Sequence, residues 1–245
     1  GMMSMKKIIL SFLLLFGLVI TQTGVLAAEE AAQNEGWQFA VDIYMWGASI
    51  GGDSASGTEV DIDFEDLFKN LNLAFMGTAG ARKGKWSFML DAIYLDVQDD
   101  DTVAPGVKAD VELFNWIVTP TIGYNLFETE KVRLDVLGGA RYLWLKSRLD
   151  LTGYPKISES GHVWDGIAGV KGQVNLTDKW YIPFYGDIGT GDSELTWQAF
   201  AGIAYKFKKV HVTLAYRYLY WEFDDNDVFD DLNLSGPYAG VRFLF

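Results

Sequence analysis

Apolar and polar residues alternate along much of the chain beyond residue 36, and the alternation is clearest in the final segment, 234–245. Residues two positions apart lie on the same face of an extended chain. One face of this segment is therefore apolar and carries Pro237, Ala239, Val241, Phe243 and Phe245. The opposite face carries Tyr238, Gly240 and Arg242. The pattern predicts a β-strand that buries one face and ends the chain on an aromatic residue.

The same alternation recurs in earlier segments, so we expect ten strands in all. Their approximate bounds are 37–45, 71–81, 86–94, 111–124, 132–146, 162–175, 180–188, 195–207, 210–223 and 234–245. Short turns alternate with longer links, such as 51–70, 96–110 and 147–161. This rhythm predicts a ladder of hairpins with both termini on one side. Eight strands are the alternative, if one hairpin lies outside the membrane.

Each apolar strand face needs a partner, and no helical segment follows that would supply a second layer. Lipid is the remaining partner. Only helices and closed barrels satisfy every backbone hydrogen bond in hydrocarbon, and the predicted strands are long enough to cross when tilted. We therefore predict an all-β fold, a closed antiparallel transmembrane up-and-down β-barrel.

Tryptophans fall near the two ends of the predicted strands, on the outward faces. On the short-turn side they are Trp37, Trp86 and Trp180, and on the other side they are Trp116, Trp144, Trp164 and Trp197. Two belts of aromatic residues mark the places where a barrel meets the lipid headgroups. A soluble β-sandwich would bury its tryptophans in the middle of its strands, so their placement favours the membrane barrel.

Residues 1–28 have the composition of an export signal. Lys6 and Lys7 precede an apolar run, 8–20, and small residues follow at Ala27 and Ala28. We expect cleavage there, a short polar lead at 29–36 and one barrel domain at 37–245. A retained transmembrane anchor is the alternative, but the apolar run is short for a bilayer helix.

Composition and charge agree with an exported barrel. The chain has 245 residues, of which 15% are aromatic, and it contains 26 glycines and no cysteine. Aromatic residues and glycines suit strands and tight turns. The net charge of −13 argues against nucleic acid as a partner.

Charged residues also occupy the predicted inward faces. The candidate lumen residues are Asp42, Asp91, Arg141, Asp165, Lys171, Asp187, Arg217 and Arg242. In a narrow barrel such groups must pair across the lumen, because an uncompensated buried charge is costly. They form either a self-neutralising polar core or a constricted passage for small solutes. We expect no wide pore, since a barrel of this size is nearly filled by its side chains.

The longer links carry most of the acidic residues, so the negative charge gathers on one rim. The candidate cation ligands there are Asp61, Asp63, Glu65, Asp66, Asp224, Asp225 and Asp227. Carboxylates suit hard divalent cations, which could also bridge the rim to anionic glycolipid. The 61–66 segment lacks the glycine and the distal glutamate of a calcium loop, and a solvated acidic rim is the alternative. We predict no cofactor.

The strand pattern and the terminal Phe245 resemble small outer-membrane β-barrel proteins of Gram-negative bacteria, such as OmpW and the transmembrane part of OmpA. The Tyr216-Arg217-Tyr218 strand and the final 234–237 segment are similar to a proteobacterial family with no assigned activity. The resemblance implies location in the bacterial outer membrane, with outer-membrane lipid and lipopolysaccharide as partners.

Some barrels of this architecture are enzymes, among them the ten-stranded omptins and the lipid A deacylases, which use Asp–His or Ser–His–acid sets. This chain has two histidines, and we expect His162 and His211 at opposite ends of the barrel. No catalytic residue is therefore predicted. The sequence favours a passive structural barrel or a narrow solute passage, with cation or ligand binding at the acidic rim and a barrel-embedded hydrolase as alternatives.

Overall fold

The computed structural model describes residues 36–53, 59–63, 65, 69–104, 107–151, 157–223 and 230–245. These described residues form twelve β-strands. In chain order they are β1 (Gln38–Trp46), β2 (Ser49–Asp53), β3 (Glu59–Ile62), β4 (Leu71–Lys83), β5 (Trp86–Ala104), β6 (Val107–Glu128), β7 (Val132–Leu151), β8 (Ile157–Asn175), β9 (Trp180–Gly191), β10 (Leu195–Lys206), β11 (Val210–Glu222) and β12 (Asp231–Leu244).

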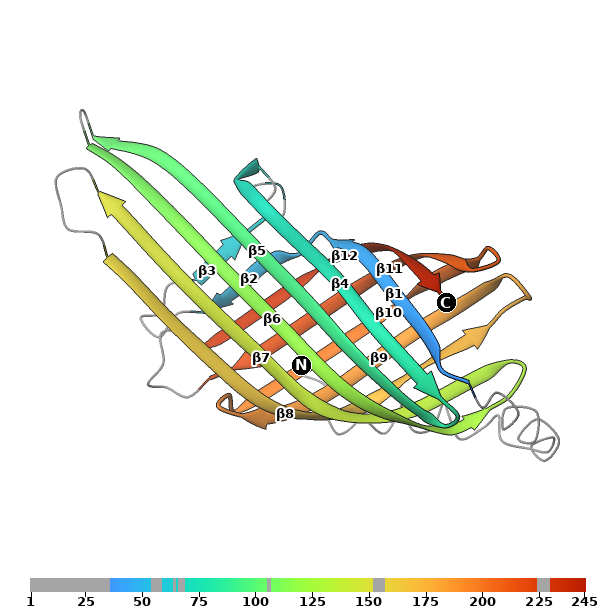
Figure 1. Ribbon diagram of the computed structural model, residues 1–245. Coiled ribbons are helices and arrows are strands. Elements are labelled where there is room, and N and C mark those ends of the chain that lie inside the picture. The colour runs from blue at the N-terminus through green and yellow to red at the C-terminus, as the bar shows by residue number, and fades with distance from the viewer. Residues whose placement is uncertain are drawn as a thin grey trace, which may run out of the picture.

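Ten of the described strands, β1 and β4 to β12, close into a barrel in which each strand is antiparallel to its neighbours. The ribbon in Figure 1 shows them tilted side by side. Closure joins β1 to β12 with Ala40 opposite Leu244, and Phe245 extends the pairing by a backbone hydrogen bond to Phe39. The prediction of a closed, ten-stranded antiparallel barrel is confirmed, and the terminal aromatic residue lies at the seam.

The strands differ greatly in length, and several of them are longer than the sequence predicted. β5 to β8 have 19 to 22 residues, whereas β9 and β10 have 12 each. The predicted links 96–110 and 147–161 are therefore largely strand, and β5 pairs with β6 as far as Ala104 opposite Val107. Figure 1 shows these four strands projecting beyond the rest of the barrel at one end. We call this projection the outer wall.

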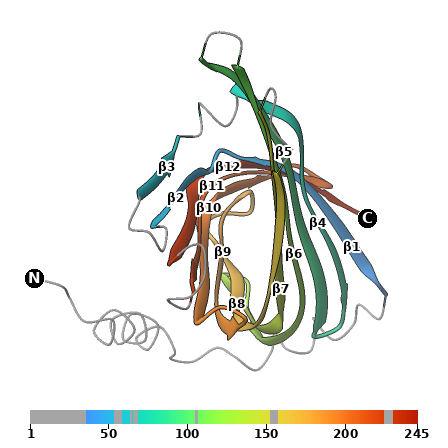
Figure 2. The same cartoon turned by 90° about the vertical axis from the view of Figure 1, so that its left-hand side faces the viewer.

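The predicted link 51–70 also contains strand, because β2 and β3 form a hairpin within it. β1 pairs with β4 only up to Ile43 opposite Gly77. The strand is interrupted at 47–48, and β2 then continues along β12. Among the described strands, the start of β4, 71–76, pairs with β5 alone. Figure 2 shows the β2–β3 hairpin and β4 on different sides of the barrel mouth.

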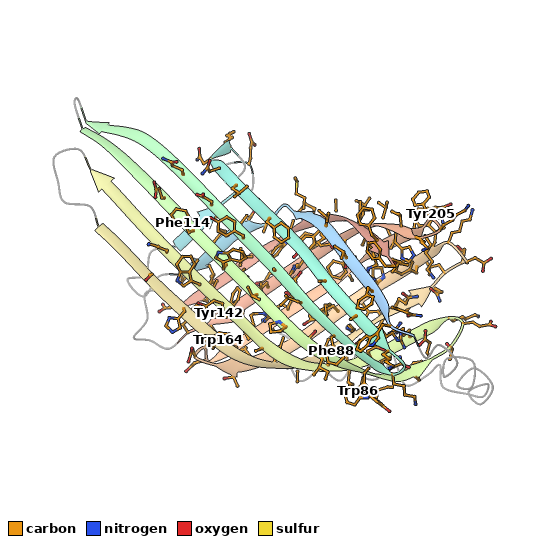
Figure 3. The ribbon with its side chains drawn as sticks, in the orientation of Figure 1. Trp86, Phe88, Phe114, Tyr142, Trp164 and Tyr205 are labelled. Atoms are coloured by element: carbon orange, nitrogen blue, oxygen red, sulfur yellow. The ribbon has the colours of Figure 1, made fainter. Side chains whose placement is uncertain are left out.

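The exterior of the barrel is apolar and is edged by aromatic residues at both ends. Near the short turns the rings of Trp86 and Tyr124 lie 5.0 Å apart. Near the opposite ends the ring centroids of Tyr142 and Trp164 lie 4.4 Å apart. Figure 3 shows Trp86 at the short-turn end of the ribbon, with Tyr142 and Trp164 displaced toward the outer wall. These two aromatic belts match the predicted headgroup positions.

A charge placed between the two belts should destabilise the barrel. Leu214 faces outward and is 60% exposed in the isolated chain, although it is apolar. Because hydrocarbon cannot solvate a guanidinium, we expect Leu214→Arg to lower the free energy of unfolding in lipid vesicles by about 2–4 kcal/mol. Guanidinium titration followed by tryptophan fluorescence measures this loss. Leu214→Ala is the control, and an equal loss in both variants would contradict a lipid-facing position.

The predicted signal, 1–28, and all of the lead except Gly36 lie outside the described residues. Among the residues that are described, no helix is long and apolar enough to cross a membrane.

Candidate functional site: the barrel interior

The interior of the barrel changes character along its axis. Inward positions near the short turns are polar, those at mid-height carry paired charges, and those toward the outer wall are apolar. In bacterial barrels the short turns lie on the periplasmic side, so we call that end periplasmic.

Arg217 on β11 is the centre of the first mid-height network. Its Nη2 donates to Asp91 Oδ2 at 2.8 Å and to Gln198 Oε1 at 2.8 Å, and its Nη1 donates to Tyr44 Oη at 3.0 Å. Tyr44 Oη and Thr78 Oγ1 both donate to Asp91 Oδ1, at 2.7 and 2.8 Å. Side chains from β1, β4, β5, β10 and β11 thus converge on one ion pair. The network therefore joins β11 to β1 and β5 across the lumen.

Arg141 on β7 is the centre of a second network. Its Nη2 donates to both carboxylate oxygens of Asp187, at 2.8 and 2.6 Å, and its Nη1 donates to Thr196 Oγ1 at 2.7 Å. Tyr185 Oη donates to Asp187 Oδ2 at 2.6 Å. The side chains of Arg141 and Asp187 are 0% exposed, so the pair is fully removed from water. Breaking a pair of this kind leaves one charge buried and uncompensated.

Asp165 is buried beside this second network but is used differently. Its Oδ1 accepts hydrogen bonds from the backbone nitrogen and the hydroxyl of Ser193, at 3.0 and 2.8 Å. Ser193 lies in the tight turn between β9 and β10. Asp165 therefore holds an outer turn rather than pairing with Arg141, which is its register partner on β7.

An apolar cluster fills the lumen on the outer side of both networks. We call it the outer plug; it consists of Trp46, Ile93, Ile117, Leu143, Leu219, Trp221, Leu232 and Leu234. The guanidinium carbon of Arg217 lies 4.7 Å from the ring centroid of Trp46, and that of Arg141 lies 5.9 Å from the ring of Trp221. These cation–π contacts join the charged networks to the plug.

A cavity of about 330 Å³ occupies the lumen on the periplasmic side of Arg217. Arg242 and Asp42 form a bidentate pair in its wall, with N–O distances of 2.7 and 2.9 Å. Arg133 donates to Asp135, and Lys171 lies opposite Asp135 in the strand register. The cavity extends from the periplasmic rim to the Arg217 network and is lined by side chains from many strands.

The eight candidate lumen residues all lie on inward faces, but the structure divides them among separate groups. Asp91 and Arg217 share one network, Arg141 and Asp187 share another, and Asp42 pairs with Arg242. Asp165 serves a turn, and Lys171 lines the cavity. The outer plug was not identified from the sequence. Its signal was present, because Leu219 and Trp221 continue the inward positions of Arg217.

The acidic rim is described only in part. Asp61 lies in β3, Asp63 follows it, and Glu65 forms an ion pair with Lys69 at 3.0 Å, with both side chains largely exposed. Asp66, Asp224, Asp225 and Asp227 lie outside the described residues. Within the part of the chain that is described, no group of three His, Cys, Asp or Glu side chains is arranged to hold a metal ion.

The two histidines occupy different ends and different faces of the barrel. His211 Nδ1 lies 2.9 Å from the hydroxyl of Tyr181 near the periplasmic end. His162 lies toward the outer end of β8, opposite Trp144. Neither lies in the mid-height networks.

Comparison with known proteins concerns the architecture. The sequence matches no protein-family model, and no curated protein matches it in sequence. Among solved structures, the outer membrane protease OmpT from Escherichia coli is similar, with 10% identity, a TM-score of 0.49 and coverage of 86% of this chain and 97% of that one. The translocator domain of the autotransporter NalP from Neisseria meningitidis has 15% identity, a TM-score of 0.48 and coverage of 89% and 92%. The attachment invasion locus protein Ail of Yersinia pestis has 14% identity, a TM-score of 0.41 and coverage of 86% and 99%.

Likenesses at this level of identity concern the fold alone. The location follows from the chain itself, because a closed barrel that turns its apolar residues outward needs lipid around it. Closed antiparallel barrels with short turns on one side and aromatic belts at both ends are typical of bacterial outer membranes. The chain is thus an outer-membrane β-barrel protein.

Proposed function

We propose that the protein is an integral outer-membrane barrel with a passive structural role, and that its lumen is closed to solutes in the state described here. The observation that carries the proposal is the filling of the lumen. The buried Arg217 network joins β11 to β1 and β5 across the lumen, the buried Arg141 network lies among β7, β9 and β10, and the outer plug contacts both arginines. Side chains packed as in a protein interior would leave no continuous path for water, which supports the proposal of a closed lumen.

A narrow passage for small solutes is the second candidate, and the cavity favours it. The lumen on the periplasmic side of Arg217 already holds about 330 Å³ of open space. Only the networks and the outer plug separate that space from the outer mouth. A rearrangement of the plug would therefore complete a path without any change in the barrel wall.

Recordings in planar bilayers separate the two candidates. We expect the wild-type protein to show no steady single-channel steps at either polarity, because the lumen is filled. Leu219→Ala combined with Leu234→Ala shortens the plug without altering a charge, and the same change at the lipid-facing Leu90 is the control. Steady steps from the wild type would contradict the closed barrel and favour the passage. Steps from the shortened variant alone would show that the plug is the barrier.

The proposed partners follow from the surfaces. The apolar exterior supports contact with outer-membrane lipid, and the acidic residues toward the outer end support bridging to lipopolysaccharide by divalent cations. We propose no nucleic acid partner, in keeping with the net charge of −13.

We propose no catalytic activity. The separation of His162 and His211 supports this, since a general base and its partners must lie within hydrogen-bonding distance of one reacting group. Hydrolysis of a peptide or of lipid A by the wild type that is lost in His162→Ala would contradict the proposal.

A further inference from the structure

The periplasmic cavity contains one more cation than its acids can pair. Each arginine in its wall has a carboxylate partner: Arg82 with Glu128, Arg133 with Asp135, Arg217 with Asp91 and Arg242 with Asp42. Lys171 is the remaining cation of the wall. No hydrogen bond or ion pair joins its ammonium group to a described residue. In a protein of net charge −13, this cavity wall is therefore locally positive.

The acid nearest to Lys171 in the strand register is already occupied. Asp135 lies opposite Lys171, but its Oδ1 accepts a hydrogen bond from Asn125 Nδ2 at 2.6 Å. Arg133 donates to both oxygens of Asp135, at 3.3 and 3.1 Å. The carboxylate thus has its own cation and an amide donor, and the ammonium of Lys171 remains available to a third group.

One hydroxyl on the same part of the wall, that of Ser87, has no partner in the part of the chain that the structure describes. Ser87 lines the cavity and is 6% exposed, and its hydroxyl has no hydrogen-bond partner among the described residues. Buried polar groups are normally hydrogen-bonded, so each unpartnered one calls for an explanation. An anionic oxygen group can accept from hydroxyls and from an ammonium together.

Glycine at position 123 brings two of these groups together. A Cβ placed on Gly123 would lie 2.6 Å from Ser87 Oγ and 3.4 Å from Lys171 Cε. The lysine side chain from β8 and the serine side chain from β5 therefore both lie above this glycine on β6. A larger residue there would separate them.

The far wall of the cavity is aromatic. The ring centroids of Tyr44 and Tyr238 lie 4.7 Å apart, and those of Phe200 and Tyr238 lie 5.0 Å apart. All three residues line the cavity, and β1 and β12 lie across the barrel from β8. A small-molecule site commonly joins an apolar wall to a few polar groups, and about 330 Å³ is at the lower end of the usual size range.

We propose that this cavity binds a small organic anion from the periplasmic side, with a carboxylate at Lys171 and an apolar or aromatic body against Tyr44, Phe200 and Tyr238. Ser87 donates its hydroxyl hydrogen to the same carboxylate. The site lies on the periplasmic side of the Arg217 network, so it does not depend on whether the outer plug opens.

Calorimetric titration of the refolded protein in detergent tests the site with two probes of nearly equal shape, benzoate and neutral benzamide. We expect saturable binding of benzoate, and binding of benzamide weaker by about tenfold or more, because the charge-assisted hydrogen bonds are lost. Acetate has the charge but not the ring, and we expect it to bind more weakly than benzoate. Absence of benzoate binding, or equal binding of benzamide, would overturn the proposal.

Variants locate the binding. Lys171→Gln should weaken benzoate by about tenfold or more and leave benzamide unchanged, and Lys171→Arg should retain the preference for benzoate. Lys179→Gln removes the same charge from the exposed turn between β8 and β9 and is the matched control. Equal benzoate affinity in Lys171→Gln and Lys179→Gln would place the anion elsewhere and refute the site. If Lys171→Gln does not refold, the titrations of the wild-type protein with benzoate, benzamide and acetate still test the proposal.

Discussion

Replacing Arg217 with alanine is expected to lower the free energy of unfolding by about 3–5 kcal/mol, the range observed when one member of a buried ion pair is removed. The guanidinium holds Asp91, Gln198 and Tyr44 at distances of 2.8 to 3.0 Å, and these groups would remain buried without it. Chemical unfolding in lipid vesicles, followed by tryptophan fluorescence, measures the loss.

Arg82→Ala is the matched control for this prediction. Arg82 pairs with Glu128 at 3.0 Å near the periplasmic rim, where the pair is partly exposed to water. Its removal should cost about 1 kcal/mol or less. Adding Asp91→Ala to Arg217→Ala removes the carboxylate that would otherwise stay buried without its partner. The double variant should therefore lose less free energy of unfolding than the sum of the two single variants. Equal costs for the two arginine variants would show that the Arg217 network is not buried as described.

Trp221→Ala is expected to be similarly costly, at about 3–5 kcal/mol, because it removes a large side chain from a filled space. Trp221 is 0% exposed and packs among the leucines of the outer plug. Its indole nitrogen has no hydrogen-bond partner among the described residues, so the loss reflects packing and the contact with Arg141. The same unfolding titration measures it.

Trp164→Ala provides the comparison within the same barrel. Trp164 is 51% exposed in the isolated chain and pairs with Tyr142 in the outer aromatic belt. Lipid can fill the space that its side chain leaves, so no cavity forms and the loss should be clearly smaller than that of Trp221→Ala. A loss at Trp164 that equals or exceeds the loss at Trp221 would contradict the packed plug.

The strand number could be predicted because lipid imposes one simple rule on every crossing segment. Residues such as Ile43 and Leu214 face hydrocarbon, and their spacing marks each strand. Beyond the apolar band, lipid no longer imposes this alternation on a strand. Asp99, Asp100 and Asp101 show no alternation, yet their backbone continues to pair with β6. The sequence therefore predicted a link where the structure has strand.

The interior could be predicted only in part, for two physical reasons. The alternation of inward and outward positions along each strand placed Arg141, Arg217 and the other candidate charges inside the barrel. Their partners come from distant strands, however, and depend on how the barrel closes. Asp165 shows this, since it binds Ser193 and not its register neighbour Arg141. The outer plug was missed although Leu219 and Trp221 keep the inward parity of Arg217, because apolar residues on an inward face do not by themselves show that they pack together across the lumen.

The unequal strand lengths make the molecule one-sided toward the cell's surroundings. At about 3.3 Å per residue, β6 alone extends for about 70 Å, whereas the apolar band of such barrels is about 25 Å tall. Even when tilted, β6 with its 22 residues is much longer than this band requires, whereas β10 has only 12 residues. A large molecule that approaches this end of the barrel would therefore meet the flank formed by β5 to β8 first.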